Sequence, residues 1–368
     1  MPGRAVVIGT GLIGTSIALA LRARGTRVWL ADADAGAVRL AADLGAGEPL
    51  PPDLPPGGLP GGPADIAVLA TPPTVVAPCL AAAQRSGLAT CYTDVASVKE
   101  LPIRRAAELD CDLTTFVPAH PMSGRERSGP AAARADLFVG RPWVICPSGD
   151  TSPGCVAVVA ATIEACGAQL IEMSPAEHDQ CVALVSHVPH LAAAAVAAQC
   201  AGAPEAALAL AGPGLRDVTR IAAGDAELWT EILTANAVPV RAALLAVAGQ
   251  LRVAADALAE VGAGHQDAAK RVTELLEAGR DGVAAIPGKR GGPAPDYAIV
   301  QVVIGDQPGE LARLFVAAGA AGINIEDVRI EHSSGLPVGV AELSVRPESA
   351  GPLSDALAAH GWPVASPA

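Results

Sequence analysis

The segment RAVVIGTGLIGTSIALALRARGTRVWLAD, residues 4–32, decides the fold of the first part of this 368-residue chain. An apolar run of strand length leads directly into three closely spaced glycines, and apolar residues with helical spacing follow as far as Gly25. A second short apolar run then ends at Asp32. Strand, glycine turn, helix and strand in this order predict the first βαβ unit of a parallel sheet.

The three glycines have GxGxxG spacing, which is a weak signal by itself. Here the motif follows a strand, opens a helix and is trailed by Asp32 at the end of the next strand, so it predicts a dinucleotide site with the pyrophosphate at the helix N-terminus. A carboxylate at position 32 accepts hydrogen bonds from ribose hydroxyls and repels a 2′-phosphate, which favours NAD over NADP without proving strict selectivity. The expected cofactor-binding residues are Gly9, Gly11, Leu12, Ile13, Gly14, Asp32 and Thr71.

The alternation of strands and helices continues beyond this unit. Strand-like runs occupy 64–71, 88–95 and 114–120, and helical patterns begin near residues 75 and 97. Residues 47–63, rich in proline and glycine, predict a surface loop. We therefore expect an α/β, Rossmann-type dinucleotide-binding domain over residues 1–172, with helices on both faces of a parallel sheet.

The pattern changes at residue 174, where Ser174, Pro175 and Glu177 predict a helix start with a capping box. From there to about residue 280 the apolar residues have helical periodicity, and no strand is evident. Alternating strands and short helices return near residue 297. We expect an all-helical substrate and dimerisation domain over 173–283, a linker over 284–296 and a small α+β domain over 297–368.

Charge and cysteine usage exclude several classes of protein. A net charge of −13 argues against binding to nucleic acid or to anionic membranes. An anionic substrate would need a local basic pocket. The eight cysteines show no CxxC or zinc-ligand spacing, so we expect reduced thiols and no metal site. The chain shows no secretory signal pattern before its first strand, and we expect a soluble, cytoplasmic protein.

Three of the seven histidines fall in HDQCVALVSHVPH, residues 178–190. In a helix His187 and His190 share a face, and Pro189 should bend that helix because it has no N–H to donate. Metal ligands, buried core residues and residues of a substrate pocket are all consistent with this spacing. We favour the pocket, because His178 is half a turn out of phase with His187 and a metal would want a third ligand.

Five motifs, taken together, resemble those of the prephenate/arogenate dehydrogenases of tyrosine biosynthesis. They are DVASVK (94–99), HPMSGRERSG (120–129), MSPAEHD (173–179), SHVPH (186–190) and GLRDVTRIAAGDAELWTEI (214–232), in order along the chain. The resemblance runs from residue 4 to about 280. It implies transfer of a hydride from ring C4 of prephenate to NAD with loss of CO2, giving 4-hydroxyphenylpyruvate. With arogenate as substrate, the product would be tyrosine itself.

The resemblance implies that His120 contacts the C4 hydroxyl as hydrogen-bond acceptor or general base, and an ordinary histidine pKa of about 6.5 suits that task. Ser97 is implied at the same hydroxyl, although it also stands where an N-cap would. Arg220 is the candidate carboxylate anchor, because a guanidinium donates two parallel hydrogen bonds, and Arg216 is a second candidate. The other substrate-binding residues implied are Glu126, Ser186, His187, His190 and Trp229.

Some of these assignments have plain alternatives. Glu126 fits an exposed loop, and Trp229 fits core packing equally well. Pro213 departs from the glycine-rich turn that the family has before this helix. The sequence does not separate a keto-acid from an amino-acid side chain on the substrate.

The segment VIGDQPGELARLFVAAGAAGINIEDVRI, residues 303–330, resembles the ACT-type regulatory module. Such modules bind amino acids at domain interfaces, which implies feedback by an effector such as tyrosine. The regulatory residues implied are Asp306, Gly309 and Asn324. A module that serves dimer contacts alone is the alternative.

Two other classes of function remain open at this stage. One is another NAD-linked hydroxyacid dehydrogenase, but that class typically has a catalytic lysine in its helical domain, and here the helical stretch offers only Lys270 near its far end. The other is a non-catalytic protein that senses NAD and an amino acid. The apolar helical domain also predicts a homodimer.

Overall fold

The structure is a computed structural model that describes residues 1–51, 59–124, 129–287, 297–332 and 337–365. It divides into two compact units, residues 1–248 and 249–368. The first unit holds two sheets and most of the helical segment. The second unit holds the rest of that segment and a small sheet with its helices.

The first sheet is parallel throughout, as the sequence predicted, with strand order β3-β2-β1-β4-β5-β6. Buried apolar side chains point to both faces of its strands, which explains why the strands read as continuous apolar runs. The strands are β1 (Arg4–Ile8), β2 (Arg27–Ala31), β3 (Glu48–Pro49), β4 (Ile66–Leu69), β5 (Tyr92–Asp94) and β6 (Phe116–Val117).

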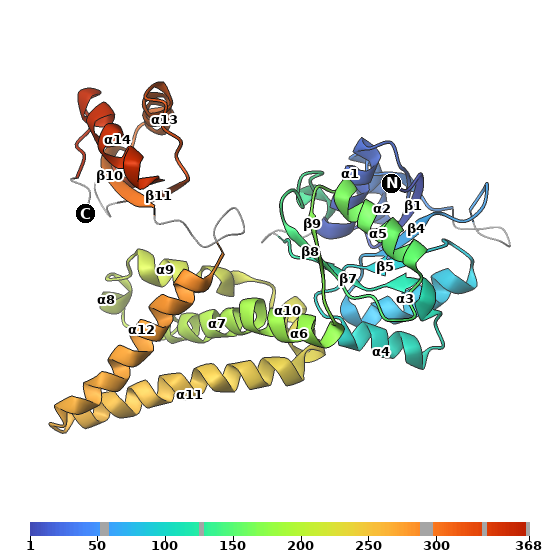
Figure 1. Cartoon of the computed structure of the whole chain (residues 1–368), viewed down its shortest axis with the longest axis horizontal. Helices are drawn as coiled ribbons and strands as arrows, with labels where there is room; N and C mark the ends of the chain where they lie inside the picture. Colours follow the sequence, from blue (N-terminus) through green and yellow to red (C-terminus); the bar gives the residue numbers. More distant parts are fainter. Residues whose placement is uncertain (52–58, 125–128, 288–296, 333–336, 366–368) are drawn as a thin grey trace. The chain divides into compact units, whose positions relative to one another are not determined.

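Helices cover both faces of this sheet (Figure 1). One core joins it to α1 (Leu12–Ala23), α2 (Ala35–Asp43) and α5 (Pro153–Ala165). The other core joins it to α3 (Pro73–Arg85) and α4 (Glu100–Glu108). Two expectations need correction. The loop expected over 47–63 contributes the edge strand β3, and the helix expected from Ser97 begins at Glu100, so Ser97 is not its N-cap.

The run 114–120 does not form one strand. A 3₁₀ turn at Leu113–Thr115 leads into β6, and the chain then enters a second sheet as β7 (Ala119–Pro121). There β7 pairs antiparallel with β8 (Pro142–Ile145), and β8 pairs parallel with β9 (Gln169–Glu172). Another 3₁₀ turn, Pro130–Ala132, lies between β7 and β8. This arrangement places His120 on β7 directly after the last strand of the main sheet.

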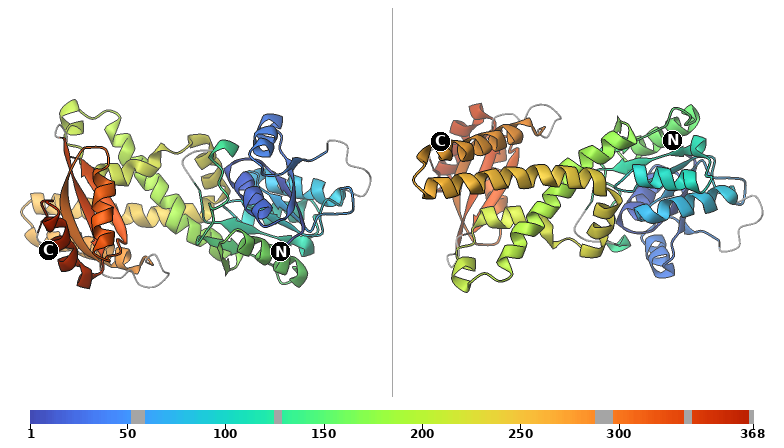
Figure 2. Two further views of the ribbon diagram at one scale, coloured as in Figure 1. Left: turned by 90° about the horizontal axis from the view of Figure 1, so that it is seen from above. Right: turned by 90° about the horizontal axis from the view of Figure 1, so that it is seen from below.

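The helical segment begins as predicted, with the Ser174 hydroxyl accepting the Glu177 backbone N–H. Its elements are α6 (Pro175–Val182), a π turn (Ala183–His187), α7 (Val188–Cys200), α8 (Glu205–Leu208), α9 (Pro213–Thr219), a 3₁₀ turn (Arg220–Ala223), α10 (Ala226–Ala235), α11 (Ala237–Gly262), a 3₁₀ turn (Gln266–Ala268) and α12 (Ala269–Ala285). In Figure 2 the green α6–α7 segment is one continuous helix. Since α12 reaches Ala285, the linker starts later than residue 284, and residues 288–296 lie outside the described chain.

Two of these helical stretches, Pro175–Cys200 and Ala237–Gly262, are long and apolar enough to cross a membrane by length and composition. The first carries buried histidines and a buried aspartate, His178, Asp179, His187 and His190. Polar groups of this kind are costly in lipid, and here they bond to other parts of the protein.

The small sheet of the second unit is antiparallel, in the order β10-β12-β11. Its elements are β10 (Ala298–Gly305), α13 (Glu310–Ala320), β11 (Asp327–His332), β12 (Val338–Val345) and α14 (Pro347–Ala359). Val364 forms an antiparallel bridge to Val302, so the chain end lies on the free side of β10. This βαββα order with a final bridge is ferredoxin-like, and both helices pack on one core with the sheet.

Candidate active site

The chemically important residues collect at the carboxyl ends of the parallel strands. Gly9 follows β1, Asp32 follows β2, Thr71 follows β4, Ser97 follows β5, and His120 lies just beyond β6. The carboxyl ends of parallel strands meet at one edge of a sheet, and ligands of open α/β sheets bind outside that edge where the strand order reverses. Here the reversal lies between β1 and β4.

The glycine turn has the geometry that a dinucleotide requires. Gly9 has a φ of +102°, and a Cβ there would lie 2.1 Å from the Ala70 carbonyl oxygen. A Cβ on Gly14 would lie 1.9 Å from the Gly9 carbonyl oxygen, so this glycine lets α1 approach β1. Gly11 is different, because a Cβ there would meet no protein atom within 4 Å. The space above Gly11, at the N-terminus of α1, is therefore open to a phosphate.

Asp32 is held in place by the glycine turn itself. Its Oδ2 accepts the backbone N–H of Thr10 at 2.6 Å and the Thr10 hydroxyl at 3.0 Å, and its Oδ1 accepts the Asp34 N–H. Burial raises the pKa of Asp32, but these hydrogen bonds outweigh burial and leave the pKa below its usual value. The carboxylate is thus charged and fixed where a ribose would lie.

Thr71 gives an independent indication of a ligand. Its Oγ1 is buried, yet among the described residues it has no hydrogen-bond partner. An orphaned buried hydroxyl calls for an explanation such as a bound ligand. Together with the open space at Gly11, it fits a dinucleotide lying along this edge; Leu12 and Ile13 follow in the first turn of α1.

A buried ion pair fixes the backbone before His120. The Lys99 ammonium contacts the Asp94 carboxylate and also donates to the Ala119 carbonyl, while Asp94 Oδ1 accepts the Ala119 N–H at 3.0 Å. The side chains of Lys99 and Asp94 are fully buried. Both the N–H and the C=O of Ala119 are therefore bonded to the β5–α4 segment. These bonds fix the backbone next to His120 and so help to position its side chain.

His120 contacts a second histidine. Its Nδ1 lies 2.9 Å from Nε2 of His178, whose Nδ1 lies 2.8 Å from Oδ1 of Asp179. Asp179 also accepts the backbone N–H groups of Lys99 and Glu100 at the start of α4. The expectation that His178 points elsewhere is wrong. The π turn takes up one extra residue, about 100° of rotation, which brings His178 and His187 to roughly a quarter turn apart.

His187 belongs to the same group of buried polar residues. The Asn236 amide nitrogen donates to the Asp179 carbonyl oxygen at 2.8 Å, and it lies 3.1 Å from His187 Nδ1. Because a carbonyl only accepts, the amide nitrogen is the atom that faces it, and its second hydrogen goes to His187 Nδ1. His187 therefore carries its own proton on Nε2.

Burial lowers the pKa of three imidazoles here, those of His120, His187 and His190. Burial is the largest cause that lowers the pKa of His120, well below its usual value, and His178, Lys99 and His187 lower it further. Burial also lowers the pKa of His187 to about 4. Burial lowers the pKa of His190 too. At neutral pH His120 therefore has a lone pair that can accept a proton. With an ordinary pKa of about 6.5, part of the population would already be protonated.

His190 and Trp229 form a stacked pair that joins α7 to α10, with ring centroids 3.6 Å apart. Trp229 also meets His187 edge to face at 6.4 Å. Gly224 makes the stack possible, because a Cβ there would lie 2.6 Å from Trp229 Nε1 and 3.1 Å from His190 Cε1. Trp229 is half-buried beside two histidines, so it is more than a packing residue of a distant core.

The other expected site residues lie on neighbouring segments. Arg216 lies in α9 and Arg220 opens the following 3₁₀ turn; both are exposed, and both segments pack against α7. Ser97 and Ser186 are half-buried. Glu126 lies outside the described residues. Within the described chain, no group of three or more His, Cys, Asp or Glu side chains is arranged to hold a metal ion.

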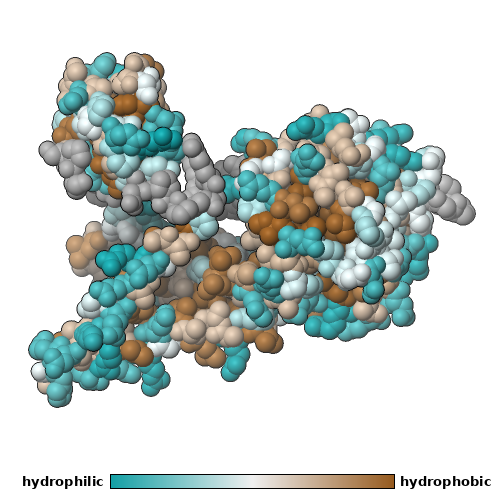
Figure 3. Space-filling model, in the orientation of Figure 1, coloured by the Kyte–Doolittle hydropathy of each residue, from teal (hydrophilic) through white to brown (hydrophobic). Residues whose placement is uncertain are grey.

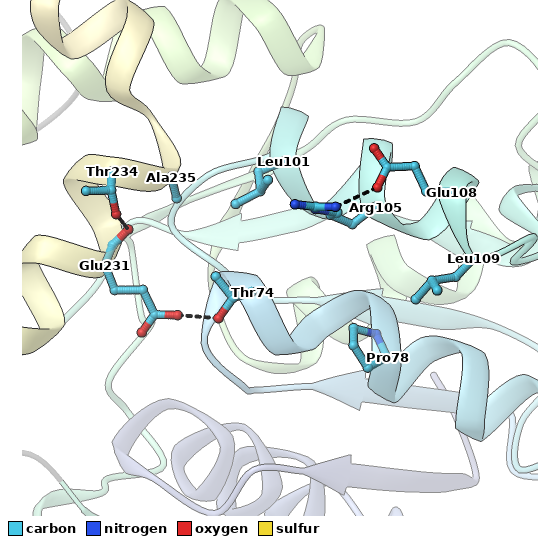
Figure 4. A pocket seen from close by; sticks show the side chains of 9 residues that line it. All are labelled: Thr74, Pro78, Leu101, Arg105, Glu108, Leu109, Glu231, Thr234 and Ala235. Atoms are coloured by element: carbon cyan, nitrogen blue, oxygen red, sulfur yellow. Dashed lines mark hydrogen bonds and ion pairs between the residues drawn. The ribbon is translucent and has the colours of Figure 1, made fainter.

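A pocket of about 510 Å³ lies beside the site, between α3, α4 and α10 (Figure 4). At its rim the Thr74 hydroxyl donates to Glu231 at 2.6 Å, which joins the helix after Thr71 to the helix that carries Trp229. Arg105 and Glu108 pair with each other at 2.8 Å on another wall. Its polar groups are thus satisfied within the protein, and it is distinct from the histidine group.

Sequence reasoning missed several residues of this site. Asp94, Lys99 and Asp179 stood inside the quoted motifs, but were given no role. Asn236 and Gly224 carried no signal, since their importance lies in contacts with residues far away in the chain.

The three expected regulatory residues lie in the second unit. Gly309 has a φ of +87° before α13, Asp306 is exposed, and the Asn324 amide donates to Glu326 at 2.8 Å.

A dinucleotide turn and a neutral imidazole at one edge of a parallel sheet define an NAD-dependent dehydrogenase. Comparison with known families agrees: residues 17–172 match the nucleotide-binding domain of prephenate dehydrogenase, and residues 174–275 match its dimerization domain. The chain belongs to the prephenate dehydrogenase family. It is 38% identical to the probable prephenate dehydrogenase NovF of Streptomyces niveus, over 98% of this chain and 99% of that protein.

Other relatives cover about two thirds to three quarters of the chain. Cyclohexadienyl dehydrogenase of Zymomonas mobilis is 30% identical over 63% of this chain and 80% of its own length. The structure of Synechocystis arogenate dehydrogenase superposes with a TM-score of 0.62 at 28% identity, over 76% of this chain and 99% of that one. Prephenate dehydrogenase from A. aeolicus, solved with hydroxyphenyl propionate and NAD+, has the same fold at 23% identity, with a TM-score of 0.64 over 76% of this chain and 98% of that chain.

Proposed function

We propose that this enzyme oxidises prephenate with NAD, giving 4-hydroxyphenylpyruvate, CO2 and NADH. The observation that carries the proposal is the state of His120: it is neutral, and its Nδ1 is engaged by His178, so Nε2 is free for a substrate hydroxyl. Among the described residues Nε2 of His120 has no hydrogen-bond partner. The dehydrogenase relatives named above support the same reaction class.

The reaction needs one proton to move twice. NAD held at the glycine turn would supply the hydride acceptor for C4. His120 takes the proton of the C4 hydroxyl as that hydride leaves, which gives a ring ketone. Loss of the C1 carboxylate as CO2 sends its electron pair into the ring and leaves a phenolate. The phenolate needs a proton, and His120 returns the one it took, so no net proton is released.

The remaining assignments are those that the family resemblance implies, and the position of the residues supports them. Ser97 is the second contact to the C4 hydroxyl, since it follows β5 at the same sheet edge. Arg220, with Arg216, anchors the substrate carboxylates, because guanidinium groups suit bidentate binding. The other pocket residues are Glu126, Ser186, His187, His190 and Trp229, and the cofactor lies on Gly9, Gly11, Leu12, Ile13, Gly14, Asp32 and Thr71.

Arogenate is the second candidate substrate, favoured by the similarity to a solved arogenate dehydrogenase. Both substrates have the same ring and differ at one side-chain carbon. Steady-state NADH formation with prephenate and with arogenate, each with NAD and NADP, decides between them. We expect the highest kcat/KM for prephenate with NAD. If neither the parent chain nor the His120→Asn variant forms NADH from either substrate, the protein is a sensor rather than an enzyme.

We also propose a homodimer formed through the helical segment, in keeping with the matched dimerization domain. Most of the helix α11 is exposed, although Val240 and Ala257 are buried, and it presents apolar side chains, among them Val238 at 82%, Leu245 at 54% and Leu251 at 62% exposure. Brown side chains gather over this helical region in Figure 3. A single chain would leave that surface in water. Light scattering on the full chain should give twice the monomer mass.

We propose residues 1–172 as the cofactor domain, 173–283 as the substrate and dimerisation domain, and 297–368 as an ACT-type module in a cytoplasmic enzyme. The ferredoxin-like order of the last part supports this division. Its effector would be an amino acid such as tyrosine, bound near Asp306, Gly309 and Asn324. Calorimetric titration of the whole chain with tyrosine tests this, and no response to any amino acid would leave the module a contact domain.

A further inference from the structure

We infer that His178 is a positioning residue which, with Asp179, fixes the tautomer of His120 and so turns the Nε2 lone pair of His120 toward the reacting hydroxyl. The inference deepens the proposed function and rests on it for the identity of that hydroxyl. The tautomer itself follows from hydrogen bonds within the protein, and it can be measured without substrate.

The donor and acceptor roles in this chain of contacts are determined from one end. Oδ1 of Asp179 accepts the Lys99 backbone N–H at 2.8 Å, and Oδ2 accepts the Glu100 N–H at 2.9 Å. Backbone N–H groups only donate, so both carboxylate oxygens act as acceptors. His178 Nδ1, at 2.8 Å from Oδ1, must then carry the hydrogen. With this single hydrogen on the ring, the lone pair of His178 is on Nε2, so Nε2 accepts.

The next contact transfers this constraint to His120. Since His178 Nε2 accepts, His120 Nδ1 at 2.9 Å must donate to it, and Nε2 of His120 keeps the lone pair. His178 and Asp179 are each 1% exposed, so water does not compete for their hydrogen bonds. The nitrogen that donates to a neighbouring acceptor keeps the hydrogen, and the other nitrogen is left for chemistry, as in serine hydrolases.

The surroundings of His120 make the tautomer, rather than the charge, the deciding property. Lys99 faces it from the β5–α4 segment, paired with Asp94; His178 faces it from α6, and His187 faces it from the π turn. Burial and these neighbours keep the pKa of His120 well below its usual value, so the ring is neutral across the working pH range. A neutral ring with its hydrogen on Nε2 would offer the substrate hydroxyl a donor and no base.

Two variants separate this role from a purely structural one. A glutamine side chain places its terminal atoms where Nε2 of a histidine lies, so His178→Gln still offers an acceptor to His120 Nδ1. An asparagine reaches only the position of Nδ1, so His178→Asn still donates to Asp179 but leaves His120 Nδ1 unpaired. We expect His178→Asn to lower kcat about tenfold or more with KM changed less than about twofold, and His178→Gln to stay within about threefold of the parent kcat.

The tautomer is read directly from ¹⁵N–¹H spectra of the histidine rings in the full-length chain, with His120→Asn used to assign the signals. The expected spectrum has His120 protonated on Nδ1, and in His178→Asn the hydrogen moves to Nε2. An Nε2 proton on His120 in the parent protein would overturn the inference. Equal losses of kcat in both variants, with unchanged thermal melting, would overturn it as well. A parent enzyme that oxidises neither prephenate nor arogenate defeats the proposed function, while the spectrum still decides the tautomer.

Discussion

His190 stacks on Trp229 with ring centroids 3.6 Å apart and ring planes 15° apart. The contact joins α7 to α10, and it places a neutral imidazole and an indole against each other beside His187. Stacked aromatic pairs are worth about 0.5–1.5 kcal/mol beyond the surface they bury. The stack therefore fixes the relative position of the two helices that carry the pocket residues.

Replacing Gly224 with alanine should disturb this stack without unfolding the protein. The new Cβ would lie 2.6 Å from Trp229 Nε1, so the indole must move away from His190. We expect KM for the substrate to rise about tenfold, equivalent to about 1.4 kcal/mol of lost binding. Steady-state kinetics measure this. Gly214→Ala is the matched control, because a Cβ there meets nothing within 4 Å; equal effects in both variants would contradict the argument.

Two glycines of the nucleotide turn should respond to alanine in opposite ways. Gly11→Ala adds a Cβ into open space, so the melting temperature should stay unchanged while the Kd for NAD rises at least about tenfold, since the added methyl occupies the phosphate approach. Gly14→Ala adds a Cβ 1.9 Å from the Gly9 carbonyl oxygen and should lower the melting temperature. Thermal melts and NAD titration by protein fluorescence separate the two. Unaltered NAD binding in Gly11→Ala would show that the cofactor lies elsewhere.

Asn236→Ala should destabilise the fold through two unpaired acceptors. The Asp179 carbonyl and His187 Nδ1 would both lose their donor in a buried site. An unsatisfied buried polar group costs about 1–3 kcal/mol, so the free energy of unfolding should fall by at least about 2 kcal/mol. Urea denaturation measures it. Gln307→Ala, at an exposed position of the second unit, is the control and should change little.

Stability should fall as the pH drops from about 6.5 toward 4. The pKa of His187 is lowered to about 4 in the folded state, below the ordinary histidine value of about 6.5, so the unfolded chain binds more protons between these values. The contribution of His187 is thus fully present above the unfolded pKa and is lost as the pH falls. The shift at His120 acts in the same direction. Urea midpoints across this range should show the slope.

His187→Asn tests which group produces that slope. Its side-chain oxygen replaces Nδ1 as acceptor for the Asn236 amide, yet it does not titrate. The loss of stability between pH 6.5 and 4 should therefore be smaller than in the parent protein. An identical slope in both proteins would assign the effect to other groups.

What the sequence predicted well was determined locally. Gly9, Gly14 and Asp32 act within one βαβ unit, and the Ser174 cap depends on a residue three positions away. The parallel sheet followed from apolar runs and helical spacing. These features need no knowledge of distant parts of the chain.

What the sequence did not predict depends on contacts between distant segments. Asp179 bonds to Lys99 across 80 residues, and Asn236 reaches His187 across 49. The prediction of the His178 orientation was wrong for another reason. It assumed 3.6 residues per turn throughout, and the π turn breaks that period. Pro189 pointed to an irregular helix, but not to the kind of irregularity.

The π turn at Ala183–His187 has a consequence for how this helix can change. Deleting one residue from the turn would restore an ordinary α-helix and leave the rotation of α7 relative to α6 almost unchanged, because the turn already absorbs one extra residue. His190 would still face Trp229, so forms shortened by one residue here should fold and stay active. An added residue that continues as α-helix would instead rotate α7 by about 100°, separate His190 from Trp229 and inactivate the enzyme.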